Sequence, residues 1–203
     1  MLSLILLLIP VSCALLHRKT GRYPFSPAVT LSSGAVCLLV GFPVLFLGLC
    51  FSALGDWFLN HERKRTWFFL CGVGGFFAGH LCFLIHSLLC GGFSWVCTAA
   101  SLSLFALLAL FLLRQLTFRK RPIRLAVWLY AAISALSFGF SLCGGFDPLP
   151  GIFFSAGIFM ILFSDGIIAL SRFGGVKGFG GWIMPTYFAC HIFIAAACAV
   201  QNL

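Results

Sequence analysis

Residues 51–65, FSALGDWFLNHERKR, join an apolar run to a basic cluster, and this junction decides how many helices the chain forms. A second basic cluster, HRKTGR, occupies residues 17–22. Basic loops of membrane proteins gather on the cytoplasmic side. The two clusters can share that side only if residues 27–60 cross the membrane twice, with a turn near GFP at 41–43.

The composition is that of a membrane protein. Of the 203 residues, 62% are hydrophobic and 8% are charged, and the mean hydropathy is +1.12. Soluble globular domains do not have this composition. The apolar run at 1–16 has no basic segment before it and no small-residue cleavage site after it, so we expect a retained first helix. The net charge of +9 suggests affinity for anionic lipid surfaces and not for nucleic acid, because no soluble domain is left to carry a basic face.

The double crossing leads to eight short helices. Further basic clusters at 114–124 and 171–177 fall on the same side, and the turns at 89–93 and 143–150 hold no basic residue. We predict an all-α integral membrane fold, a single bundle of eight short transmembrane helices that forms one polytopic domain over residues 1–203. Both termini are expected outside the cytosol, in a bacterial inner membrane or a eukaryotic endomembrane. The predicted helices are 2–16, 27–41, 43–60, 67–88, 93–113, 124–142, 150–171 and 180–200.

The ten cysteines show no CxxC or zinc-ribbon spacing. We therefore expect most of them to be reduced thiols packed between helices. Cys90 and Cys143 are each followed by Gly-Gly-Phe at a predicted outer helix end. A disulfide between these two cysteines is the alternative in an oxidising compartment.

The four acidic residues divide into two kinds. Glu62 and Asp147 fall in loops, but Asp56 and Asp165 lie inside predicted helices. An ionised Asp at the centre of a membrane helix costs about 3 kcal/mol on insertion scales. Both Asp residues lie roughly 6–9 Å from the cytoplasmic end of their helices. Such a pair faces a cavity, a partner or a substrate, or it ties neighbouring helices together.

Three further polar residues accompany the pair. Tyr187 lies at nearly the same depth, His191 lies one turn deeper on the same face, and His80 lies near the middle of the membrane. With the two Asp residues, His80 and His191 could form the N2O2 zinc site of a hydrolase. A proton or ion pathway of a transporter, or a lipid-binding protein without catalysis, is also compatible. Because the polar groups gather in the cytoplasmic half, a closed enzyme cavity is favoured over a transport path.

Four segments carry a resemblance to a known family: SALGDWFL (52–59), GVGGFFAGHLCFL (72–84), FSDGIIAL (163–170) and MPTYFACHIFI (184–194). In this order and spacing, the chain resembles the YhhN-type lysoplasmalogenase family of eight-helix membrane proteins over roughly residues 27–200. The motif positions are Gly55, Asp56, Gly72, Phe76, His80, Ser164, Asp165 and Tyr187. The family's Tyr-Tyr-x-Ala-Gln is here Tyr187, Phe188, Ala189, Cys190 and His191, so that His191 replaces a Gln, and Gly166 stands in place of a Ser.

The resemblance implies a hydrolase that cleaves the vinyl ether bond of lysoplasmalogen to a fatty aldehyde and a glycerophosphocholine or glycerophosphoethanolamine. A lysophospholipid and the bilayer would be its partners, no cofactor or metal is expected outside the zinc alternative, and the oligomeric state is open. The expected catalytic residues are Asp56, Asp165, Tyr187, His191 and His80. The expected substrate-binding residues are Ser52, Ser164, Phe76 and Arg172.

Vinyl ether hydrolysis asks for two carboxyl groups in different states. Protonation of the β carbon gives an oxocarbenium ion, which water then captures. One carboxyl must therefore carry a proton near neutral pH while the other is ionised, as in the carboxyl pair of glycosidases. Our hypothesis makes Asp165 the acid and Asp56 the anion, with Tyr187 and His191 orienting water; the reverse assignment is equally compatible. Arg172, seven residues beyond Asp165 on nearly the same helix face, could hold the phosphate.

Overall fold

A computed structural model describes residues 2–21, 25–61, 65–118, 120–143 and 145–201, and in these ranges it is all-helical. Helices α1 and α2 meet at Leu7 and form one rod, so eight rods result. Seven of the eight rods are long and apolar enough to cross a membrane, and the rod of α3 is shorter. The helices are α1 (Leu2–Leu6), α2 (Leu8–Thr20), α3 (Phe25–Leu39), α4 (Pro43–Asn60), α5 (Thr66–Gly91), α6 (Trp95–Gln115), α7 (Arg121–Ser141), α8 (Pro148–Phe173) and α9 (Gly180–Gln201). The predicted eight-helix membrane fold is confirmed.

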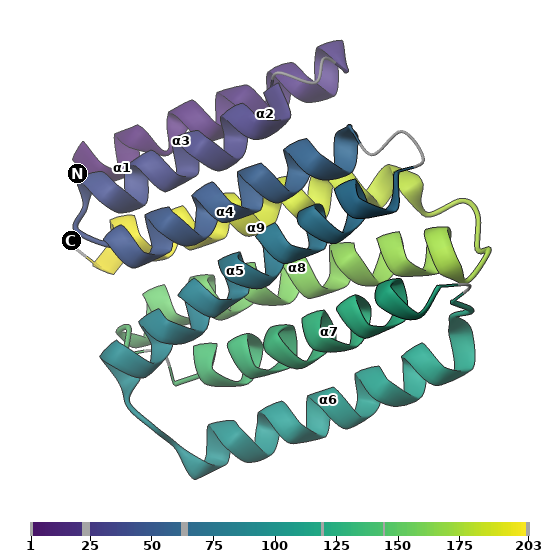
Figure 1. Cartoon of the computed structure of the whole chain (residues 1–203). Coiled ribbons are helices and arrows are strands. Elements are labelled where there is room, and N and C mark those ends of the chain that lie inside the picture. Colours follow the sequence, from purple (N-terminus) through teal and green to yellow (C-terminus); the bar gives the residue numbers. More distant parts are fainter. Residues whose placement is uncertain (1, 22–24, 62–64, 119, 144, 202–203) are drawn as a thin grey trace.

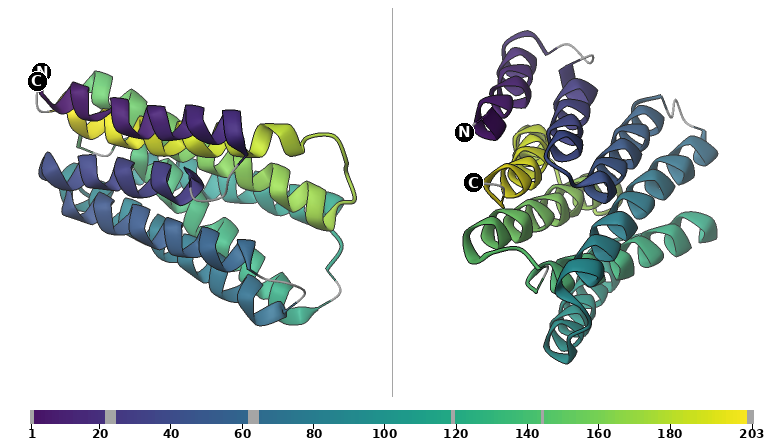
Figure 2. Two further views of the ribbon diagram at one scale, coloured as in Figure 1. Left: turned by 90° about the horizontal axis from the view of Figure 1, so that it is seen from above. Right: turned by 90° about the vertical axis from the view of Figure 1, so that its left-hand side faces the viewer.

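Six of the helices form a closed ring. Following the contacts around the bundle, α3 packs on α4, α4 on α5, α5 on α7, α7 on α8, α8 on α9, and α9 returns to α3. Helices α1 and α2 lie outside this ring against α3 and α9, and α6 lies outside it against α7 (Figures 1 and 2). The ring encloses the largest cluster of buried side chains, and every ring helix can direct side chains to one interior.

Helices α4 and α5 cross with their backbones in close approach. A Cβ atom added to Gly75 would lie 2.9 Å from the Cα of Gly55, and one added to Gly55 would lie 3.0 Å from the carbonyl oxygen of Gly72. Small residues allow such packing between membrane helices, where no hydrophobic drive brings the helices together. The crossing fixes the position of Asp56, which follows Gly55 directly, relative to α5.

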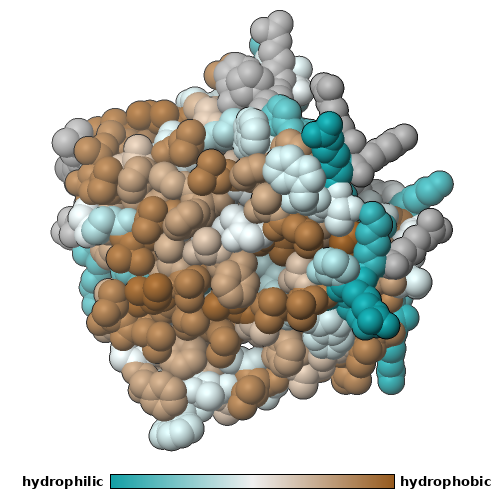
Figure 3. Space-filling view, viewed as in Figure 1, coloured by the Kyte–Doolittle hydropathy of each residue, from teal (hydrophilic) through white to brown (hydrophobic). Residues whose placement is uncertain are grey.

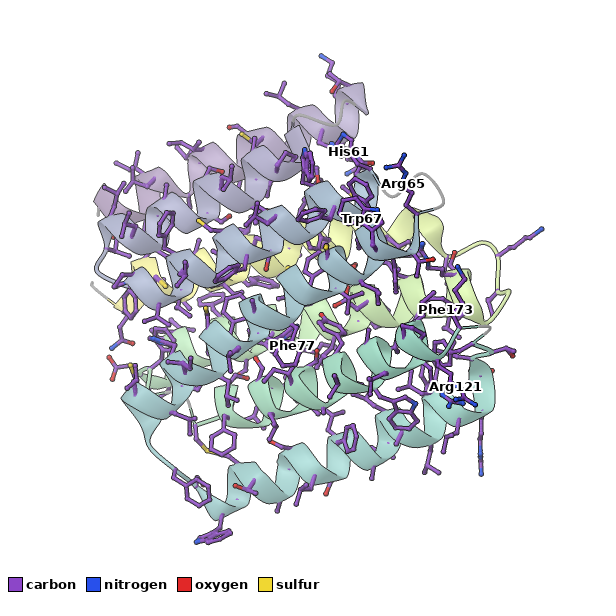
Figure 4. All side chains as sticks on the ribbon, in the orientation of Figure 1. His61, Arg65, Trp67, Phe77, Arg121 and Phe173 are labelled. Atoms are coloured by element: carbon purple, nitrogen blue, oxygen red, sulfur yellow. A yellow bond between two sulfur atoms is a disulfide. The ribbon has the colours of Figure 1, made fainter. Side chains whose placement is uncertain are left out.

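The two ends of the bundle differ in polarity. Hydrophilic side chains gather at one end, on the right in Figure 3, and the middle of the visible face is hydrophobic. His61, Arg65 and Arg121 are labelled at this basic end in Figure 4. Both chain termini lie at the opposite end (Figure 1). Residues 22, 62–64 and 119 of the basic clusters, including Glu62, lie outside the described ranges.

The first helix continues past its predicted end. The prediction stopped it at residue 16, before the basic residues, but α2 includes His17, Arg18 and Lys19 and ends at Thr20. Basic side chains are favourable in the last turn of a helix, next to its unpaired carbonyl groups. Gly21 then ends the helix with a φ of 62°, and its N–H donates to the carbonyl of His17.

The disulfide alternative named the wrong partner for Cys143. In the structure Cys143 is bonded to Cys97, with 6.8 Å between their Cα atoms. Cys90 keeps a free thiol, although its Cβ lies beside the backbone of Gly145. Sequence repeats do not supply the distance and direction that a disulfide needs, and the start of α6 brings Cys97 to the turn instead. Within the described ranges the other cysteines are reduced, as expected for most of them.

Candidate functional site

Asp56 of α4 and Asp165 of α8 line the same cavity, which has a volume of about 430 Å³. We call this space the main cavity; Tyr187 of α9 and Arg172 of α8 also line it. His17 belongs to the lining as well, so the main cavity lies toward the basic end of the bundle. Both Asp residues are half-buried, and both border this one space.

The Asp56 carboxyl is held by a tyrosine. The hydroxyl of Tyr187 donates to Oδ2 of Asp56 over 2.5 Å. Behind it the ring of His191 meets the Tyr187 ring edge-on, with 4.4 Å between the ring centres. His191 is fully buried, and its Nε2 atom has no hydrogen-bond partner in the described part of the chain. Tyr187 therefore fixes the direction of the Asp56 carboxyl from the interior of the six-helix ring.

The Asp165 carboxyl is held in the same manner by Tyr130 of α7. The hydroxyl of Tyr130 donates to Oδ2 of Asp165. Nε2 of His80, from α5, lies 3.0 Å from the same hydroxyl, and the His80 and Tyr130 rings meet edge-on at 5.4 Å. A buried chain of polar groups thus connects His80 to Asp165 through Tyr130. Such chains rigidify the groups that they connect when each member has a partner.

Tyr130 is a site residue that the sequence reasoning missed. The prediction grouped residues by their depth along each helix, and depth does not tell which helix faces which. One signal was available, because the chain has only three tyrosines. Tyrosine prefers the membrane interface, and Tyr130 lies well inside α7. A tyrosine away from the interface needs a polar partner for its hydroxyl.

Arg172 stands where the main cavity meets the basic end. Its guanidinium lies over the Phe69 ring, 4.4 Å from the ring centre. It also lines a neighbouring recess of about 550 Å³ together with Lys120 and Thr117. A guanidinium is planar, stacks on aromatic faces and matches the geometry of carboxylate and phosphate groups. Arg172 therefore lies where the main cavity, this neighbouring recess and the basic end meet.

The sequence model of the YhhN family matches residues 24–198. The chain belongs to the YhhN family. Membership supports a lysoplasmalogenase-like membrane protein at the level of the family. Comparison with curated proteins and with solved structures gives no significant match.

The YhhN motif residues have different surroundings. Phe76 lines the main cavity and meets the Tyr187 ring edge-on at 6.2 Å. Ser52 does not line this cavity: it is buried at the crossing of α4 and α5, and its hydroxyl donates to the carbonyl of Gly48. Ser164 is also buried and donates to the carbonyl of Ile183, which links α8 to α9. The backbone thus supplies an acceptor for both serine hydroxyls, and neither serine is in the lining of the main cavity. Their contact with a substrate stays a prediction.

Gly166 and His191, which depart from the YhhN pattern, differ in how much room surrounds them. A Cβ atom on Gly166 would have no atom within 4 Å, so the serine of the family pattern fits there. His191 is enclosed, with Nδ1 at 3.5 Å from Sγ of Cys190. A glutamine at this position would lose the ring contact with Tyr187 described above.

The residues of this YhhN protein do not fit the zinc alternative. Among the side chains that the structure describes, no three of His, Cys, Asp and Glu gather to hold a metal ion. His80 reaches Asp165 only through Tyr130, and His191 lies behind Tyr187. A tetrahedral zinc site needs its ligands at about 2.0–2.2 Å from one point. The two tyrosines separate the histidines from the carboxyl groups.

Proposed function

We propose that this protein hydrolyses the vinyl ether bond of lysoplasmalogen and releases a fatty aldehyde and a glycerophosphocholine or glycerophosphoethanolamine. The observation that carries the proposal is that two carboxyl groups share one cavity, each held by a tyrosine from a different helix. An acid-catalysed reaction with an oxocarbenium transition state needs such a pair. Family membership supports the same class of substrate.

In the proposed reaction Asp165 is the acid and Asp56 the anion. Protonated Asp165 gives its proton to the β carbon of the vinyl ether, which leaves an oxocarbenium ion at the α carbon. Ionised Asp56 stabilises this cation and accepts a proton from the water that attacks the α carbon. The resulting hemiacetal collapses to the aldehyde and the free glycerol hydroxyl. Proton return from Asp56 to Asp165 restores the starting state.

The lysolipid head group is assigned to the basic end. Arg172 lines the main cavity at that end, and a guanidinium forms paired hydrogen bonds with phosphate oxygens. A lysolipid has a single chain, so its glycerol can enter the bundle while its phosphate stays at the interface. The proposed partners are therefore the lysophospholipid and the bilayer that supplies it.

The basic end is assigned to the cytosol. Basic residues favour the cytoplasmic side, and disulfides persist in oxidising compartments. Cys97–Cys143 lies at the start of α6, at the end opposite the basic residues. Both signals support the proposal that the two termini lie outside the cytosol. A glycosylation acceptor added to either terminus is expected to be modified in a eukaryotic host; a pattern of modification at the basic loops alone contradicts this orientation.

Proton-coupled transport is the second candidate, and one observation favours it. Buried polar side chains continue along α7 past the site, at Ser134, Ser137 and Ser141. The hydroxyls of Ser134 and Ser137 have no hydrogen-bond partner in the described ranges. These serines extend the buried polar groups beyond the cytoplasmic half, where the sequence analysis placed most of them. Serines also allow close helix packing in membranes, and both candidate functions predict them.

The deciding experiment measures aldehyde release by purified protein. Wild type is expected to cleave lysoplasmalogen and not its saturated ether analogue. Asp56→Asn and Asp165→Asn are expected to lower the rate by about a hundredfold or more. The size-exclusion profile of each variant controls for folding, and a chelator added to the wild type tests for a metal. Absence of aldehyde, together with proton flux into liposomes that either substitution abolishes, would replace the hydrolase by the transporter.

A further inference from the structure

A second, smaller space lies between α5, α7 and α8, and four of the residues that line it also line the main cavity. It has a volume of about 80 Å³, and we call it the apolar recess. The helix residues Val73, Val127 and Ala169 line it, and among the described residues of its lining only Tyr130 and Asp165 carry polar side-chain atoms. Mostly apolar pockets with few polar groups are typical of small-molecule sites.

Asp165 stands at the junction of the two spaces. It lines the main cavity and the apolar recess, as do Leu59, Phe76 and Ile168. Asp56 and Arg172 line the main cavity but not the recess. A molecule that occupies both spaces therefore has its polar part beside Asp56 and Arg172, and its apolar part passes Asp165.

We propose that the apolar recess is the subsite for the first carbons of the substrate's hydrocarbon chain. This inference rests on the proposed function. The vinyl carbons follow directly after the ether oxygen, so the recess brings the β carbon beside Asp165 and leaves the ether oxygen on the side of Asp56. The orientation makes Asp165 the proton donor to carbon, and it removes the ambiguity that the sequence left between the two Asp residues.

The small size of the recess has a consequence for selectivity. About 80 Å³ accepts the first atoms of a chain and not the whole of a long one, so the rest of the chain lies outside the recess. Branching near the ether bond is therefore expected to block the reaction, and chain length is expected to matter little. Val73, Val127 and Ala169 are the residues that set this selectivity.

The test uses photo-crosslinking, because crosslinking does not depend on turnover. Two saturated ether lysolipids are compared, one with a diazirine next to the ether and one with a diazirine at the methyl end. The probe with the proximal diazirine is expected to label peptides of α5, α7 and α8 that contain Val73, Val127 or Ala169. Labelling of α9 near Met184 instead, or labelling equal for both probes, overturns the subsite.

Two substitutions fill the recess. Ala169→Phe and Val73→Phe are each expected to lower the proximal crosslink and the kcat/KM for aldehyde release by about tenfold or more. Ala106→Phe is the matched control, since Ala106 is exposed on α6, outside the ring. If both recess variants keep wild-type labelling and rates, the recess is not the chain subsite.

The crosslinking and turnover results together distinguish failure of the proposed subsite from failure of the proposed hydrolysis. Wild-type protein that releases aldehyde but is labelled elsewhere contradicts the subsite and leaves the hydrolase standing. Wild-type protein that is labelled in the recess but releases no aldehyde supports the subsite and contradicts hydrolysis. A branched lysoplasmalogen that is cleaved as fast as the unbranched one contradicts the subsite.

Discussion

The close crossing of α4 and α5 predicts that alanine has different effects at two neighbouring glycines of α5, Gly74 and Gly75. A Cβ on Gly75 would lie 2.9 Å from both N and Cα of Gly55, whereas a Cβ on Gly74 would have no atom within 4 Å. Carbon atoms pack best at about 3.5–4.0 Å, so Gly75→Ala has to separate the two backbones by at least about 0.6 Å. Asp56 follows Gly55 and moves with it.

The magnitudes follow from opposing effects. Alanine gains up to about 1 kcal/mol over glycine in a helix at either position. Overpacking at Gly75 costs about 1–3 kcal/mol, which Gly74 does not incur. Gly74→Ala is thus expected to be neutral or stabilising, and Gly75→Ala to be less stable than it by about 1–3 kcal/mol. Since a displacement of 1 Å can cost a hundredfold in rate, Gly75→Ala is expected to release aldehyde about tenfold more slowly.

The assay compares the two variants side by side. Unfolding in a denaturing detergent gives the difference in stability, and aldehyde release per folded molecule gives the difference in rate. Both variants carry the same added methyl group on the same helix, so general effects of the substitution cancel. Equal stability and equal rates in the two variants would refute the argument that the α4–α5 crossing positions Asp56.

Three other substitutions test separate parts of the structure. Tyr130→Phe is expected to slow aldehyde release by about tenfold or more and to cost about 1.2 kcal/mol of stability, at most about 3.4 kcal/mol, because two membrane hydrogen bonds are lost, one to Asp165 and one with His80; an unchanged rate would exclude a role for this hydroxyl. Gly166→Ser is expected to change the stability by less than about 0.5 kcal/mol and to keep activity, as measured by unfolding and aldehyde release. Cys97→Ser is expected to lower the stability by about 2–4 kcal/mol without slowing the folded enzyme, a difference that should disappear when wild type is reduced.

The helices could be predicted from the sequence because hydropathy and basic loops are strong, local signals. The predicted span 43–60 agrees with α4 at both ends, where Pro43 begins the helix and His61 follows it. The other predicted helix ends differ from the observed ends by up to four residues, since helix ends depend on caps and on charges next to carbonyl groups. The first helix is the clearest case, because Gly21 and not Leu16 provides the geometry that ends it.

The order of helices around the ring could not be predicted from the sequence. Helix α5 packs on α7, and the intervening α6 lies outside, so chain order does not give neighbours. Tyr130 could not be assigned to Asp165 without this order, and Cys97 could not be assigned to Cys143. The depth of Asp56 and Asp165 along their helices could be estimated from the sequence, because depth depends only on the rise per residue. The two residues do line one cavity.

Five of the six ring helices each contribute a polar side chain at or next to the two carboxyl groups. These side chains are Asp56 of α4, His80 of α5, Tyr130 of α7, Asp165 of α8 and Tyr187 of α9. Such a set is not explained by stability. An ionised Asp at the centre of a membrane helix costs about 3 kcal/mol on insertion scales. Hydrogen bonds between membrane helices contribute about 0.6 kcal/mol on average and at most about 1.7 kcal/mol.

One tyrosine hydroxyl for each Asp therefore does not offset the cost of its carboxyl. An apolar interior of the same shape would make a more stable ring, as it does when buried ion pairs are replaced by packed apolar residues. The two half-buried carboxyl groups border a cavity instead of filling a gap between helices. Catalysis accounts for this position, since a carboxyl group can give or take a proton only where a substrate can reach it. The loss of stability is thus confined to the place where the carboxyl groups can react.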